Sequence, residues 1–106
     1  MDVCVLTANL LFYSAVEGVA GAMGHKARQV ESVDEVGKPD LLIADGSMGM
    51  DVPDLAARAD PLRIAYFAQG HDREMMSAAR ANGIAHVCRR GALADELPGI
   101  IAEYAV

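Results

Sequence analysis

The chain has 106 residues, 53% of them hydrophobic and 23% charged, which fits one globular domain and excludes a disordered segment. Its net charge of −6 argues against direct nucleic-acid binding, because contact with a phosphate backbone needs clustered Lys and Arg. The sequence has neither a signal-peptide pattern nor an apolar run approaching about 18 residues, so we expect a cytoplasmic protein with no membrane partner.

The first half of the chain alternates apolar runs with a helical pattern. Residues 3–8 are nearly all apolar, which predicts a strand covered on both faces. Asn9 is suited to cap a helix over residues 10–24. The alternation of polar and apolar residues over 26–31 indicates a strand at the edge of a sheet.

The middle of the chain carries the clearest strand end. Residues 32–38 leave room for about one helical turn, so we expect the second helix to be very short or absent. Residues 41–44 are apolar throughout and are followed by Asp45. This pattern predicts a buried strand with a carboxylate at its carboxyl end.

The second half continues the alternation of helix and strand. The expected elements are a helix from Asp51 or Pro53 to Ala59, a strand over 63–68, a helix capped by Asp72 and ending near Asn82, a strand over 84–88, and an amphipathic helix over 93–104. Short loops between alternating elements indicate parallel strands joined by right-handed crossovers. We therefore predict one α/β domain over residues 1–106, an open five-stranded sheet in the flavodoxin-like order 2-1-3-4-5 with helices on both faces.

In this topology a site lies beyond the carboxyl ends of the first and third strands, which are residues 7–9 and 45–47. Small residues also form a stripe along the first helix, which allows close approach either to the sheet or to another helix across a dimer, and we expect the sheet: Ala15, Gly18, Gly21 and Ala22. The two cysteines, Cys4 and Cys88, lie within apolar runs and are expected to be reduced and buried.

One segment resembles a known family. Residues 39–45 (Pro-Asp-Leu-Leu-Ile-Ala-Asp), followed by residues 48–51 (Met-Gly-Met-Asp), resemble the third strand, phosphoacceptor and following loop of bacterial response-regulator receiver domains. The pattern of residues 62–90 is similar to the family's fourth strand, fourth helix and fifth strand, so the resemblance spans nearly the whole chain. It implies two-component signalling, in which a histidine kinase and a magnesium ion phosphorylate an aspartate.

The resemblance assigns a role to each residue at the strand ends. Asp45 matches the phosphoacceptor. The family's acidic pair, which holds magnesium, falls on Thr7 and Ala8, and neither can supply a carboxylate. Asn9 offers only a weak amide oxygen. We therefore expect a degenerate metal site, with no metal and no cofactor.

The positions that read out phosphorylation in the family are also changed. The hydroxyl residue falls on Ala68, the lysine on Arg90, and the aromatic switch residue on Val87. Arginine keeps the positive charge but carries it on a larger planar group. The sequence thus resembles a pseudo-receiver, a non-catalytic regulatory domain that the usual aspartyl phosphorylation does not switch.

Alternatives for Asp45 remain open at this point. It could be a residual phosphoacceptor, an ion-pair partner of Arg90, or a solvent-exposed strand end that caps the following loop. The corresponding functions are an atypical receiver phosphorylated by a histidine kinase, or a binder of anions or small ligands at the strand-end crevice. No nucleophile and base pair is visible, so we do not expect an enzyme.

The predicted helix over 72–82 and the last helix match the family's fourth and fifth helices, the face that receivers commonly use for partners. Its interface candidates are Met75, Met76, Arg80 and Val87. We expect a protein partner or a homodimer there. The resemblance implies a role in transcription regulation, and a regulator of this type can continue after Val106 into an output domain.

Overall fold

The sheet has five parallel strands. The computed structural model describes residues 1–105, and their strands are β1 (Val3–Leu6), β2 (Ala27–Val30), β3 (Leu41–Asp45), β4 (Ile64–Ala68) and β5 (His86–Arg89). Hydrogen-bonded neighbours follow the order β2-β1-β3-β4-β5, which confirms the predicted flavodoxin-like topology.

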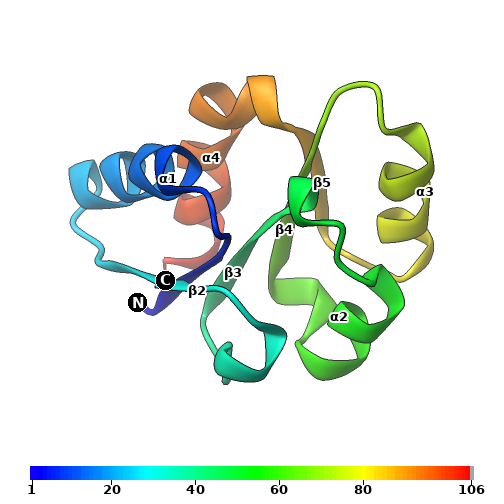
Figure 1. Cartoon of the computed structure of the whole chain (residues 1–106). Helices are drawn as coiled ribbons and strands as arrows, with labels where there is room; N and C mark the ends of the chain where they lie inside the picture. The colour runs from blue at the N-terminus through cyan, green and yellow to red at the C-terminus, as the bar shows by residue number, and fades with distance from the viewer. Residues whose placement is uncertain (106) are drawn as a thin grey trace.

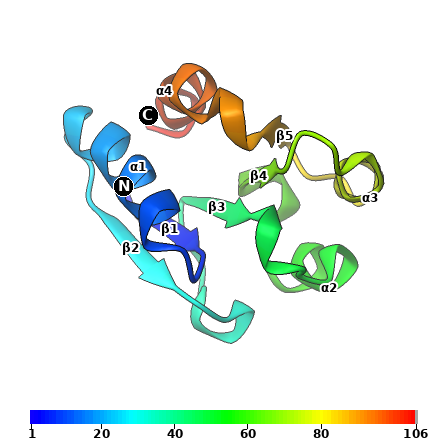
Figure 2. The same cartoon turned by 45° about the horizontal axis from the view of Figure 1, so that its top comes forward.

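Four α-helices cover the two faces of the sheet: α1 (Leu10–Ala22), α2 (Val52–Arg58), α3 (Arg73–Ala81) and α4 (Leu93–Tyr104). Helices α1 and α4 lie on one face, and α2 and α3 lie on the other (Figures 1 and 2). Each face has its own apolar cluster, because successive residues of a strand point to opposite sides. Cys4 and Leu6 of β1 pack toward α2 and α3, whereas Val3 and Val5 pack toward α1 and α4.

The segment between β2 and β3 holds only a 3-10 turn, Val33–Glu35. This agrees with the expectation of a very short second helix. As a result, α3 and α4 are the elements that the sequence analysis expected as the fourth and fifth helices.

Local side-chain and backbone contacts fix the helix ends. Asn9, Asp51 and Asp72 each accept a backbone N–H of the helix that follows, as predicted for N-caps. At the C-terminal end of α3, Gly83 has a φ of 79° and donates to the Arg80 carbonyl. This left-handed conformation suits glycine and ends the helix at the predicted place.

The start of β5 differs from the prediction by two residues. The backbone N–H of Ile84 donates to the Ala79 carbonyl, and that of Ala85 to the Pro61 carbonyl. Together with the bond of Gly83, the bond of Ile84 completes a Schellman motif. Ile84 is therefore buried as part of the helix end, and the strand begins only at His86.

The small-residue stripe of α1 does not pack against the sheet, so this prediction is wrong. Phe12, Val16 and Ala20, spaced by four residues, form the buried face of the helix. Ala15, Gly18, Gly21 and Ala22 are all exposed. They lie on the opposite side because each residue turns the helix by about 100°.

None of the helices in residues 1–105 has the length and apolar character of a membrane span. Both cysteines are free; Cys4 is fully buried and Cys88 is partly exposed. Burial raises the pKa of the Cys4 thiol from 9.0 to about 11. Burial also raises the pKa of Cys88.

We predict that a thiol reagent at pH 8 labels Cys88 first and Cys4 only when the chain unfolds, which mass spectrometry can follow.

The raised pKa of Cys4 favours the protonated native state, so its contribution to stability is complete below pH 9 and is lost as the pH rises toward 11. A Cys4→Ala variant should lose less unfolding free energy between pH 9 and 11. An equal loss in both proteins would contradict this role of Cys4.

Candidate functional site

The register of the sheet brings Thr7 and Asp45 together. Leu6 pairs with Ala44, so the next residue of each strand lies at the same edge. Thr7 and Asp45 are both 0% exposed, and Asp45 is the one charged residue that is buried among residues 1–105. A charge buried in this way needs hydrogen-bond partners, because desolvation disfavours the ionised form.

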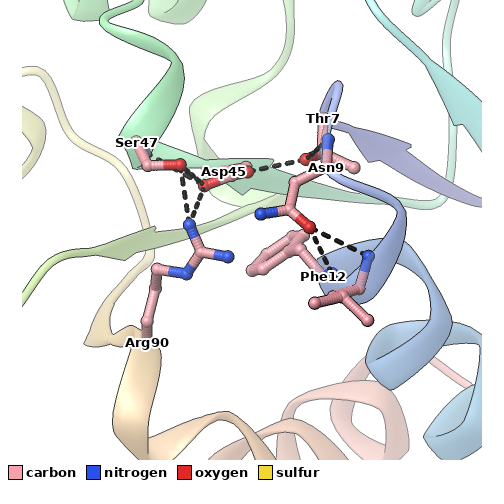
Figure 3. Close-up of polar contacts among 7 residues, drawn as sticks. Thr7, Asn9, Phe12, Asp45, Ser47 and Arg90 are labelled. Carbon is pink, nitrogen blue, oxygen red and sulfur yellow. Dashed lines mark hydrogen bonds and ion pairs between the residues drawn. The ribbon is translucent and has the colours of Figure 1, made fainter.

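Both carboxylate oxygens of Asp45 have partners (Figure 3). The Thr7 hydroxyl donates to Oδ2 at 2.6 Å. The Ser47 backbone N–H and hydroxyl donate to Oδ1 at 3.0 and 2.7 Å, respectively. The fourth donor is Arg90, whose Nη1 lies 3.1 Å from Oδ1.

Arg90 connects three parts of the site. Its Nη1 donates to the Ser47 hydroxyl at 2.7 Å as well as to Asp45. Its guanidinium carbon lies 4.9 Å from the centre of the Phe12 ring, a cation–π distance. The side chain is only 26% exposed. Arg90 therefore ties the end of β5 to the end of β3 and to α1.

Thr7 is itself held in place. Its hydroxyl accepts the Asn9 backbone N–H at 3.0 Å while it donates to Asp45. Its carbonyl accepts the Gln29 side-chain amide, also at 3.0 Å. The hydroxyl thus has a fixed donor direction toward Asp45.

The structure shows the contact between Asp45 and Arg90 that was one of the alternatives for this aspartate. The reading of Asp45 as a solvent-exposed strand end is wrong, because the side chain is 0% exposed, although it does cap the following turn. Ala8 is exposed beside the site, and Asn9 uses its side-chain oxygen to cap α1. Ala68 packs on the opposite face with α2 and α3 and brings no polar group to Asp45.

The hydrogen bonds of Ser47 and the position of Phe12 were not predicted, although Ser47 lies within residues 45–47, where a site was expected. Ser47 follows Asp45 by two residues, and an aspartate that accepts the N–H two residues on forms an Asx turn. The spacing Asp-Gly-Ser is a signal that could have identified it. Phe12 could not have been identified in this way, because helical spacing predicts only its burial and not the cation above its ring.

Tyr66 and Gly46 lie behind the Asp45 turn. Tyr66 is fully buried, and its hydroxyl has no hydrogen-bond partner among residues 1–105. Burial, then the charges of Asp72 and Asp45, raise the pKa of this phenol. A Cβ on Gly46 would lie 2.8 Å from the Phe67 carbonyl oxygen and from the end of the Tyr66 ring. Only glycine fits between these groups.

We expect Tyr66→Phe to raise the free energy of unfolding by about 1 kcal/mol, because it removes a buried hydroxyl that lacks a partner and keeps the packed ring. Urea denaturation measures this change. A loss of stability instead would mean that the hydroxyl has a hydrogen-bond partner in solution, such as a bound water.

The interface candidates fall into two groups. Met76 is only 8% exposed and packs in the core with α2 and the sheet, so its assignment to a surface was wrong. Met75 and Val87 are half-buried and Arg80 is exposed. Adjacent residues of a helix point in directions about 100° apart, and here Met75 is the methionine nearer the surface.

The sequence matches no protein-family model and no curated protein at a significant level. Its structure is similar to that of NtrX from Brucella abortus, solved in complex with ADP (TM-score 0.79, 17% identity); the match covers 97% of this chain and 26% of NtrX. It is also similar to a response regulator from Thermotoga maritima (TM-score 0.75, 16% identity, 97% and 95% covered). A candidate response regulator from Chloroflexus aurantiacus gives a TM-score of 0.75 at 19% identity, with 95% and 97% covered. The chain spans about a quarter of NtrX and nearly all of the other two. It thus has the flavodoxin-like fold of these response regulators.

Proposed function

We propose that this domain is a receiver-like protein-interaction module whose strand ends are held together by an ion pair rather than by a phosphoryl group. The proposal rests on the hydrogen bonds that the Asp45 carboxylate accepts. Its buried carboxylate accepts hydrogen bonds on both oxygens, from Thr7, Ser47 and Arg90. A nucleophile that attacks a phosphodonor needs an accessible lone pair, so this arrangement disfavours phosphorylation.

The residues beside Asp45 support the same conclusion. Magnesium in protein sites usually takes one or two carboxylates in addition to water and phosphate oxygens. Thr7 and Ala8, at the positions of the family's acidic pair, have none. The Thr7 hydroxyl also occupies Oδ2 of Asp45. Phosphorylation of Asp45 would have to displace these contacts without a metal site to assist it.

Arg90 holds the strand ends in the way that a contact with a phosphoryl group on Asp45 would. It joins β5 to β3 through Asp45, so the surface formed by α3, β5 and α4 keeps one arrangement. The interface candidates that remain on this surface are Met75, Arg80 and Val87. We propose that a protein partner or a second copy of the chain binds there, and that signalling depends on binding rather than on a chemical switch.

The phosphorylation part is tested with acetyl phosphate and magnesium, by measuring the intact mass of the protein. We expect no added phosphoryl mass. A gain that disappears in Asp45→Asn would contradict the proposal and favour an atypical receiver that is still phosphorylated.

The interaction part is tested with the double variant Met75→Ser, Arg80→Glu, measured by sedimentation equilibrium and by capture of partners from cells. We expect the variant to lose self-association or the captured partner. The control is Lys26→Glu, an exposed residue before β2. Unchanged self-association and unchanged capture in the double variant would rule out this surface.

A further inference from the structure

A hollow of about 640 Å³ lies at the end of the sheet opposite Asp45. The C-terminal end of α2 and the loop that precedes β3 line it; Figure 1 shows where these two segments run. This volume is within the range of sites that bind small molecules. The hollow is independent of the Asp45 site and of the surface on α3, β5 and α4.

The short segment before β3 accounts for the hollow. Between β2 and β3 the chain forms only the turn Val33–Glu35, so α2 has no full helix beside it on the side away from α3. Leu42 of β3 lines the space from the sheet, and Ala56 and Ala59 line it from the end of α2. Small side chains at these positions leave the space open. Leu42 also belongs to the core cluster on this face, which gives the hollow a rigid apolar wall.

The carboxylates around the hollow already have partners. Oδ2 of Asp40 accepts the Asp2 backbone N–H at 2.7 Å. Oδ1 of Asp60 accepts the Leu62 backbone N–H at 3.0 Å, as the cap of a 3-10 turn. Each carboxylate thus has one oxygen engaged within the chain, which makes it a weaker acceptor for a cationic ligand than a carboxylate without partners.

The cations around the hollow differ in how many hydrogen bonds and ion pairs they form within the chain. Arg58 pairs with Asp34 and Asp54. Arg63 donates Nη1 to the Asp40 carbonyl at 3.1 Å, and its Nε lies at a loose 3.9 Å from Asp60. Lys38 has no hydrogen bond or ion pair with any group of residues 1–105. The donors left for a ligand are therefore the Lys38 ammonium and part of the Arg63 guanidinium.

We propose that this hollow binds a small organic carboxylate with an apolar body. The apolar part would lie against Leu42 and the rings of Pro39 and Pro61, and the carboxylate would meet Lys38 and Arg63 at the rim. Charge-assisted hydrogen bonds of this kind orient a ligand, and the apolar wall supplies the burial.

Benzoate is a suitable probe, titrated into the 15N-labelled chain and followed by amide NMR. We expect saturable shifts confined to residues that line the hollow, such as Leu42 and Ala59. Benzyl alcohol, which lacks the charge, and inorganic phosphate, which lacks the apolar body, should each bind at least several-fold more weakly.

Lys38→Ala should weaken benzoate binding by roughly tenfold, as expected for loss of one charge-assisted contact. Ala56→Leu should also weaken it, because the larger side chain takes up part of the hollow, and Lys26→Ala, at another exposed lysine, should have no effect. The proposal is overturned if benzoate gives no saturable shifts, if the shifts lie at Asp45 instead, or if Lys38→Ala binds as tightly as the unmodified chain.

Discussion

Arg90→Met should lower the free energy of unfolding by about 2–3 kcal/mol, measured by urea denaturation. The substitution keeps the apolar stem beside Phe12 but leaves the Asp45 carboxylate buried without its cation. Removing one partner of a buried pair costs about 3–5 kcal/mol, and the partial exposure of Arg90 places this pair at or below the lower end of that range.

The neighbouring Arg89 is a matched control. It is exposed and has no ion-pair partner among residues 1–105, so Arg89→Met should change stability by about 0.5 kcal/mol or less.

A double-mutant cycle separates the pair from the general effect of the substitution. Asp45→Asn in the Arg90→Met background removes the buried charge, so the double variant should be more stable than the sum of the two single losses implies. The expected coupling is about 1–3 kcal/mol. Additive losses would mean that Asp45 and Arg90 do not stabilise each other.

Gly46→Ala should lower the free energy of unfolding by about 1–3 kcal/mol. The new methyl group would lie 2.8 Å from the Phe67 carbonyl oxygen, which is backbone and cannot move aside without disturbing β4. Because Gly46 immediately follows Asp45, the same displacement should also disturb the bonds from Ser47.

The control for Gly46→Ala is Gly18→Ala in α1. A Cβ at Gly18 would meet nothing within 4 Å, and alanine is up to about 1 kcal/mol better than glycine in a helix. Gly18→Ala should therefore raise stability while Gly46→Ala lowers it.

Combining Gly46→Ala with Tyr66→Phe should recover only part of the lost stability, because the contact with the Phe67 carbonyl oxygen remains. Full recovery would show that the tyrosine hydroxyl alone excludes the methyl group.

Local signals in the sequence predicted most of the fold. The caps Asn9 and Asp72 act on backbone groups within three residues, so their effect can be predicted without knowledge of the tertiary structure. The buried strand before Asp45 was also predicted, since a strand covered on both faces is apolar throughout and this run is followed directly by polar turn residues. Ile84 was assigned to the wrong element because burial in a helix-terminating motif and burial in a strand give the same apolar pattern.

The site was predicted only where contacts follow from strand order. The topology placed Thr7 beside Asp45 and brought Arg90 within reach. It did not predict that Asp45 would be fully buried, because burial depends on how Ser47, Arg90 and Phe12 close over the strand end. The choice between Met75 and Met76 likewise required the rotation of α3, which the sequence does not specify to within one residue.

In the proposed function the ion pair between Asp45 and Arg90 fixes the strand ends without phosphorylation. The most direct measurement compares amide NMR spectra of the 15N-labelled chain before and after addition of magnesium and acetyl phosphate. We predict no change in the resonances of Asp45, Arg90 and the surface formed by α3, β5 and α4. Shifts across these elements that are absent in Asp45→Asn would show that phosphorylation does switch the domain, and would contradict the account.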